Sequence, residues 1–215
     1  MVKQWVPEYR HGSATTLPVT QTRVPRAATA EKRVRILDAV ERIMVRDGYA
    51  AVTTRRVEAE AGIKVHYHFG TLDDLFVAVI RRRGEDAVAQ LAEALASDEP
   101  LRAWWAMAAE RRGNALLVEL TAAANHRPAV QAELAAFAVR FRRMQLDALG
   151  PILDTYGIDR DRFPPALVAA TVQGLGFAMA HDQVAGFDTA QADATAAVER
   201  LLEHLEARRS ARPPA

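Results

Sequence analysis

Cysteine is absent from the 215-residue sequence, and long apolar runs are missing as well. Without cysteine there is no disulfide framework, no thiolate nucleophile and no Cys-ligated metal. No segment approaches the roughly 18 apolar residues of a membrane-spanning helix. The opening stretch, MVKQWVPEYRHGSATTLPVT, lacks the apolar core of a secretory signal peptide. We therefore expect a soluble cytoplasmic protein that has no membrane partner.

The sequence also lacks the common motifs of enzymes. It contains no G-x-S-x-G elbow, no phosphate-binding loop and no dinucleotide fingerprint. His66 and His68 stand two residues apart, so on a helix they point roughly 200° away from each other and cannot easily share a metal ion. Asp73 and Asp74 suit the first turn of a helix better than acid–base catalysis. These absences predict a protein that is not an enzyme and has no cofactor or metal.

The alternation of apolar and polar residues that is typical of β-strands is also absent. Half of the residues are hydrophobic, and they recur at helical rather than at period-2 spacing, which predicts an all-α fold. Thr29 is the expected N-cap of the first helix, and Gly150-Pro151 is expected to break or kink a long one. The expected helices cover about residues 29–47, 53–61, 65–69, 71–95, 101–107, 114–125, 128–149, 165–185 and 188–208.

The charges of the chain are unevenly distributed. Residues 1–83 hold 15 Lys+Arg and 9 Asp+Glu, a net charge of +6, whereas the remaining residues hold 13 and 18, a net charge of −5. A basic front favours a polyanionic partner, although chance clustering is the alternative. Residues 1–28 are expected to form a flexible basic arm, which could follow phosphates or be simply a solvated tail.

Three short helices with a tight Ala61-Gly62 turn between the second and the third predict a helix-turn-helix over residues 29–83. In this motif the second helix braces across the DNA backbone and the third enters the major groove. Hydroxyl and guanidinium groups at the start of the second helix suit phosphates, and the third supplies donors and aromatic faces. The candidate DNA-binding residues are Thr53, Thr54, Arg55, Arg56, Lys64, His66, Tyr67 and His68, with Val65 and Phe69 as anchors.

This region resembles the DNA-binding domain of TetR-family transcriptional regulators. The matching pieces are ILDAV, the G-Y-x-x-x-T-T that follows, the AG turn, the Y-x-F close of the recognition helix and the start TLDDLF of the next helix. The resemblance covers residues 30–83. It implies a homodimer built from the last two long helices, a small-molecule pocket in the C-terminal domain (84–208, followed by a tail, 209–215), and repression that the effector relieves.

The sequence departs from the family pattern at two places. Many members carry a lysine in the first turn of the helix after the motif, where this chain has Leu72 and two aspartates. The family usually has about ten residues from the AG turn to the closing phenylalanine, and this chain has seven, IKVHYHF. Three residues remove about 4.5 Å of helix and about 300° of rotation. Either the protein truly lacks three residues after Lys64, which leaves a recognition helix of about a turn and a half, or the printed sequence omits them.

Aromatic and polar residues of the C-terminal region are candidates for an effector pocket, although each aromatic residue by itself is more often plain core. Glu119 interrupts the apolar run ALLVELTAAA, so it could orient a ligand or point to solvent. The candidate pocket residues are Trp104, Trp105, Met107, Glu119, Phe137, Phe141 and Phe177.

Small residues in the helix over 166–183 permit close helix crossing, as a dimer interface needs, and the last helix offers an apolar stripe as its partner. An intramolecular core is the alternative. The candidate interface residues are Ala170, Gly174, Phe177, Val198, Leu201 and Leu205. The leading hypothesis is a homodimeric, effector-responsive repressor that binds a palindromic DNA operator. The alternative is a small-molecule-binding homodimer of the same fold with impaired specific DNA binding.

Overall fold

The computed structural model describes residues 26–184, 186 and 191–211. Within these residues the chain forms eight α-helices and two 3-10 helices and no β-strand, which confirms the all-α fold. None of these helices is long and apolar enough to cross a membrane. The elements are α1 (Arg26–Asp47), η1 (Tyr49–Ala51), α2 (Thr54–Ala61), η2 (Val65–Tyr67), α3 (Leu72–Leu95), α4 (Pro100–Ala108), α5 (Arg111–Ala124), α6 (Pro128–Thr155), α7 (Pro165–Val184) and α8 (Gln191–Ser210).

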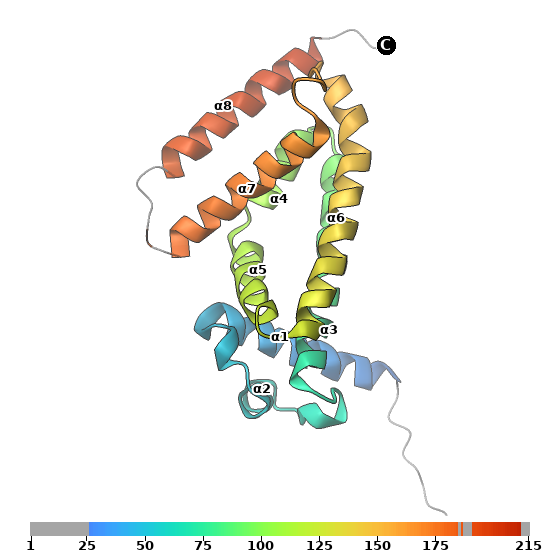
Figure 1. Ribbon diagram of the computed structural model, residues 1–215, viewed down its shortest axis with the longest axis vertical. Coiled ribbons are helices and arrows are strands. Elements are labelled where there is room, and N and C mark those ends of the chain that lie inside the picture. Colours follow the sequence, from blue (N-terminus) through green and yellow to red (C-terminus); the bar gives the residue numbers. More distant parts are fainter. Residues whose placement is uncertain (1–25, 185, 187–190, 212–215) are drawn as a thin grey trace, which may run out of the picture.

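A head forms at one end of the molecule from α1, η1, α2, η2 and the start of α3 (Figure 1). Its core gathers the apolar faces of α1 and α3, and the anchors Val65 and Phe69 are 4% and 5% exposed within it. The start of α3 is fixed by a capping box, in which the Thr71 hydroxyl accepts from the Asp74 N–H and the Asp74 carboxylate accepts from the Thr71 N–H. The end of η2 is therefore held against the rest of the head.

A larger body extends from the head. α3 leaves the head and runs beside α6 along the long axis, and α4, α5 and α7 lie across from α6 (Figure 1). α8 is tied to the end of α6, because the Tyr156 hydroxyl donates to Glu206 over 2.5 Å. Burial and this carboxylate raise the pKa of Tyr156 to about 12, so the phenol stays protonated and remains a donor.

Some element ends differ from expectation. α1 begins at Arg26, so Thr29 lies inside the helix and is not its N-cap, because Ala27 and Ala28 before it are good helix formers. α6 continues through Pro151 without a break. Proline removes only one backbone donor, and the fully buried Leu149 and Leu153 on either side hold the helix in place. Most of the expected arm, residues 1–25, and the end of the expected tail, residues 212–215, lie outside the described residues.

Candidate functional site

The second helix of the head begins and ends as its sequence predicts. The Thr53 hydroxyl oxygen accepts from the Arg56 backbone N–H over 3.3 Å and caps α2. Gly62 closes the helix in the left-handed region, with φ 67°, and its N–H donates to the Glu58 carbonyl. A side chain is strained in this conformation, so the turn requires a glycine.

The recognition segment is a single 3-10 turn, η2, which is shorter than the turn and a half expected. Glu58 of α2 holds it in place. Its carboxylate accepts from the Val65 N–H over 3.0 Å and from the Lys64 ammonium over 2.8 Å. These bonds, Lys64 first, lower the pKa of Glu58, so it remains a carboxylate. The lysine expected to contact DNA is thus paired within the head.

The eight candidate DNA-binding residues divide by exposure and pairing. Thr54 and Arg55 are exposed, and their side chains form no ion pair or hydrogen bond with another described residue. Tyr67 is 77% exposed, and its ring contacts the exposed His66 ring at a centroid distance of 4.0 Å. Arg56, in contrast, pairs with Asp47 of α1 over 2.5 Å. Thr54, Arg55, His66 and Tyr67 therefore make the exposed outer surface of the motif, where the His66 Nδ1 atom lies 3.7 Å from the Glu58 carboxylate.

His68 does not belong to that surface. Its ring is half-buried, and its Nδ1 atom has no hydrogen-bond partner among the described residues. Burial first, and then the nearby Lys32 and Arg33, lower the pKa of His68. The structure gives this histidine a packing position in the head, where a DNA contact was one of the roles expected.

Two arginines of α1 that the sequence analysis did not select hold the motif to that helix. Arg33 donates to the His68 carbonyl over 2.6 Å and stacks over the Phe69 ring at 4.2 Å. Arg35 donates to the Ala61 carbonyl over 3.0 Å. The run Lys32-Arg33-x-Arg35 on the polar face of α1 was the signal available for finding them.

A cavity of about 800 Å³ lies in the body between α3, α4, α5, α6 and α7. This volume falls within the range of small-molecule sites. Its wall is mainly apolar, and α6 approaches α3 so closely that a Cβ atom on Gly84 would lie 2.8 Å from the Phe137 ring. Five of the candidate pocket residues line the cavity, namely Trp104, Met107, Phe137, Phe141 and Phe177.

The other two candidates lie elsewhere. Trp105 is 4% exposed and packs in the core of the body, and it does not line the cavity. Glu119 also stands apart from the cavity, and its carboxylate accepts from the Tyr49 N–H over 2.7 Å. Glu119 therefore connects α5 to the head. It can do so from within an apolar run because its carboxylate accepts from the Tyr49 backbone N–H.

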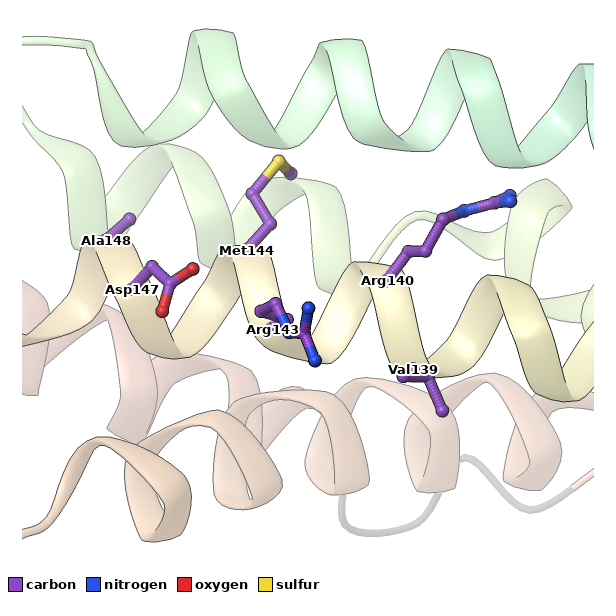
Figure 2. Close-up of a pocket in the computed structure, with 6 residues that line it drawn as sticks. All are labelled: Val139, Arg140, Arg143, Met144, Asp147 and Ala148. Atoms are coloured by element: carbon purple, nitrogen blue, oxygen red, sulfur yellow. The ribbon is translucent and has the colours of Figure 1, made fainter.

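A second, shallower depression of about 580 Å³ runs along the outside of α6 (Figure 2). A single helix supplies all of the residues that line it, including Arg143 and Asp147, one turn apart in Figure 2. It encloses a molecule less well than the cavity, which has walls from five helices. Among the described residues, no group of three or more His, Cys, Asp or Glu side chains is placed to hold a metal ion.

The candidate interface residues also divide. On α7, Ala170 and Gly174 are exposed and Phe177 is 40% exposed, although all three also border the cavity. On α8, Leu201 is 57% exposed, whereas Val198 and Leu205 pack against the core of the protomer. Two of the three apolar candidates on α8 thus belong to the core of the protomer. Such an intramolecular core is the alternative to a dimer interface that the sequence left open.

The arrangement of head and body has counterparts among solved structures. No protein-family model and no curated protein matches the chain. A protein from Rhodococcus sp. assigned to the TetR family of transcriptional regulators has a TM-score of 0.63 and 20% identity, over 84% of this chain and 98% of the other. A Pseudomonas aeruginosa PAO1 protein assigned as a transcriptional regulator has a TM-score of 0.62 and 15% identity, over 90% and 99% of the chains.

A transcriptional regulator from Rhodococcus sp. Rha1 has a TM-score of 0.56 and 21% identity, over 83% of this chain and 94% of the other. The likeness runs through head and body alike. The chain therefore has the fold of TetR-like transcriptional regulators. At these identities the likeness establishes the fold, and the activity has to be argued from the site.

Proposed function

We propose that this protein is a DNA-binding transcriptional regulator of the cytoplasm, which acts as a homodimeric repressor at a palindromic operator and responds to a small-molecule effector. One observation carries the proposal. A helix-turn-helix head with an exposed surface of Thr54, Arg55, His66 and Tyr67 is joined by one continuous helix, α3, to a body with a cavity of about 800 Å³.

α3 supplies the coupling that an effector needs. Its first turns carry Leu75 and Phe76 into the core of the head, and its middle turns carry Gly84 and Ala87 to the cavity wall. If α3 can take two positions, an effector that binds the protein more tightly in one of them increases the fraction of molecules with α3 in that position. Because α3 carries the head, the spacing of the two heads in a dimer changes with it.

The proposed dimer is supported by apolar side chains that the protomer leaves in solvent on its last two helices. Leu167 and Phe177 of α7 are 49% and 40% exposed, and Leu201 of α8 is 57% exposed. A twofold interface places two heads on one DNA duplex, as a palindromic site requires.

The test is a salt-dependent mobility-shift assay with the full chain on the DNA upstream of its own gene. We expect a specific complex at low salt, whose affinity falls as salt is raised because phosphate contacts release counterions. Arg55→Ala should weaken it, whereas Arg143→Ala on the outside of α6 should not. If no specific complex forms at any salt concentration, the regulator proposal fails.

A second candidate is a small-molecule-binding dimer with impaired specific DNA binding. The single 3-10 turn of η2 and the Lys64–Glu58 pair favour it, because they leave few groups free to reach base edges. Three helix-forming residues inserted after Lys64 distinguish the candidates. Specific binding by the lengthened variant alone would favour the second candidate, and equal binding by both proteins would favour the first.

A further inference from the structure

We propose that the cavity binds an amphipathic organic anion, whose apolar part lies on the aromatic wall and whose acid group pairs with Arg142 of α6. This inference rests on the proposed effector cavity and names the chemical class of its ligand.

The apolar part of the ligand follows from the wall. Trp104, Phe137, Phe141 and Phe177 converge on the cavity from α4, α6 and α7. Aromatic faces supply large apolar contact areas at fixed geometry, so they suit a flat or elongated hydrocarbon body. A fully polar ligand would leave these side chains without apolar partners.

The charge of the ligand follows from the charged residues of the wall. Arg83 is already committed, because it pairs with Glu41 over 3.7 Å and with Asp86 over 3.5 Å. Glu110 caps α5 and accepts from the backbone N–H groups of Arg112 and Gly113 over 2.9 Å and 2.6 Å.

Arg142 differs from these groups. It lines the cavity and is partly buried, and its guanidinium has no ion pair or hydrogen bond with another described residue. Arg142 is therefore the cation of this wall that has no carboxylate partner among the described residues, whereas the Glu110 carboxylate is taken up by the N-terminus of α5. A guanidinium in a partly dry wall gains most from an anion that can accept two of its N–H groups, such as a carboxylate or a sulfonate.

Gln145 stands next to this wall, although it is not one of the residues that line the cavity. It is fully buried, and neither its amide nitrogen nor its amide oxygen has a hydrogen-bond partner among the described residues. It follows Phe141 by four residues and Arg142 by three, so it lies one turn from them on the same side of α6. A buried amide without partners is costly, but the acid group of the ligand is assigned to Arg142 alone. A cationic ligand would meet Arg142 instead and be repelled.

Two fluorescent probes test the class of ligand directly. 8-Anilinonaphthalene-1-sulfonate and N-phenyl-1-naphthylamine share the same aromatic body, and only the first carries an acid group. Each is titrated into the full-length protein, with fluorescence as the readout and the number of sites per chain fitted. We expect the sulfonate probe to bind more tightly by about tenfold, the size of one charge-assisted pair. Arg142→Gln should abolish this preference and leave the affinity of the neutral probe unchanged.

Matched variants separate the pairing from general effects. Arg142→Lys keeps a cation and should keep most of the preference, and Arg143→Gln on the outside of α6 should behave like the wild type. If Arg142→Gln does not fold, Arg142→Met keeps a long side chain without the charge and should reduce the sulfonate preference several-fold. Equal affinities of the two probes, or a preference that survives both substitutions, would overturn this inference but leave the cavity proposal intact. If neither probe binds, the effector cavity itself is wrong.

Discussion

At the residue scale, folding moves His68 of the head out of water and next to two cations. The His68 ring is half-buried, its Nδ1 is unpartnered among the described residues, and Lys32 and Arg33 lie close enough to disfavour a positive charge. The folded state therefore prefers the neutral imidazole. The nearby His66 is exposed on the outer surface of the motif and provides a natural control.

The first prediction concerns pH. Because folding lowers the pKa of His68 below its ordinary value of 6.5, the unfolded chain takes up a proton before the folded one as the pH falls. The contribution of His68 to stability is thus present above about pH 6.5 and is lost below it. Urea unfolding at pH 7.5 and 5.5 should show a smaller loss of stability in His68→Gln than in the wild type. A loss as large as that of the wild type would contradict this, and His66→Gln should resemble the wild type.

At the element scale, one helix crossing depends on a glycine. α7 passes over the end of α4 so closely that a Cβ atom on Gly176 would lie 2.2 Å from the Ala108 carbonyl oxygen. Two residues earlier on the same helix, a Cβ atom on Gly174 would meet nothing within 4 Å. The two glycines therefore have opposite structural roles, although both were counted as small residues of one helix.

The second prediction follows from this pair. Gly176→Ala should destabilise the fold by about 1–3 kcal/mol, because backbone atoms of α4 cannot yield as a flexible side chain can. Gly174→Ala should stabilise it by about 0.5–1 kcal/mol, since alanine restricts the unfolded chain more and nothing opposes its methyl group. Chemical denaturation of the two variants measures both effects, and equal effects would disprove the crossing.

Most helices could be predicted from the sequence because their signals are local. Thr53, Gly62 and Thr71 mark ends through bonds within a few residues, and the structure contains those bonds. The course of α6 through Pro151 could not be predicted in this way, since burial of its flanking leucines against other helices decides it. Tertiary packing overrides local preference at such positions.

The candidate site was predictable to a similar degree. The aromatic wall could be suspected from composition, but which of Arg142 and Arg143 faces inward depends on the packing of α6. Gln145 could have been selected from the sequence as a buried polar residue, since it stands in a stripe of apolar residues at helical spacing. Glu119 gave the same kind of signal, and only the structure shows that its partner is the head and not a ligand.

At the scale of the whole molecule, the third prediction concerns assembly. If α7 and α8 form the interface, Leu201→Glu should convert the dimer to a monomer, because it places a charge among apolar side chains with no partner. Val139→Glu is the matched control, since Val139 is 62% exposed on α6, outside the proposed interface. Size-exclusion chromatography with light scattering gives the mass of each protein. A wild-type mass equal to the 23.6 kDa chain would refute the dimer.

The contact between body and head is the other property of the whole molecule. Glu119 of α5 accepts the Tyr49 N–H over 2.7 Å, directly after the turn that ends α1. Around the same junction, Arg127 pairs with Asp73 and the Tyr49 and His126 rings stack at 6.5 Å. Glu119 thus joins α5 to the head through an acceptor that lies outside the cavity.

The last prediction tests that junction. Glu119→Ala leaves the Tyr49 N–H without its acceptor, so hydrogen exchange at this amide should accelerate by about tenfold or more. Glu119→Gln keeps a carbonyl acceptor and should restore most of the protection.

Both variants should bind the two naphthalene probes as the wild type does, because Glu119 does not line the cavity. The Ala variant should, however, show a smaller effect of the anionic probe on DNA affinity than the wild type, since α5 then holds the head less firmly. Unchanged exchange at Tyr49 would remove Glu119 from the connection between effector and DNA.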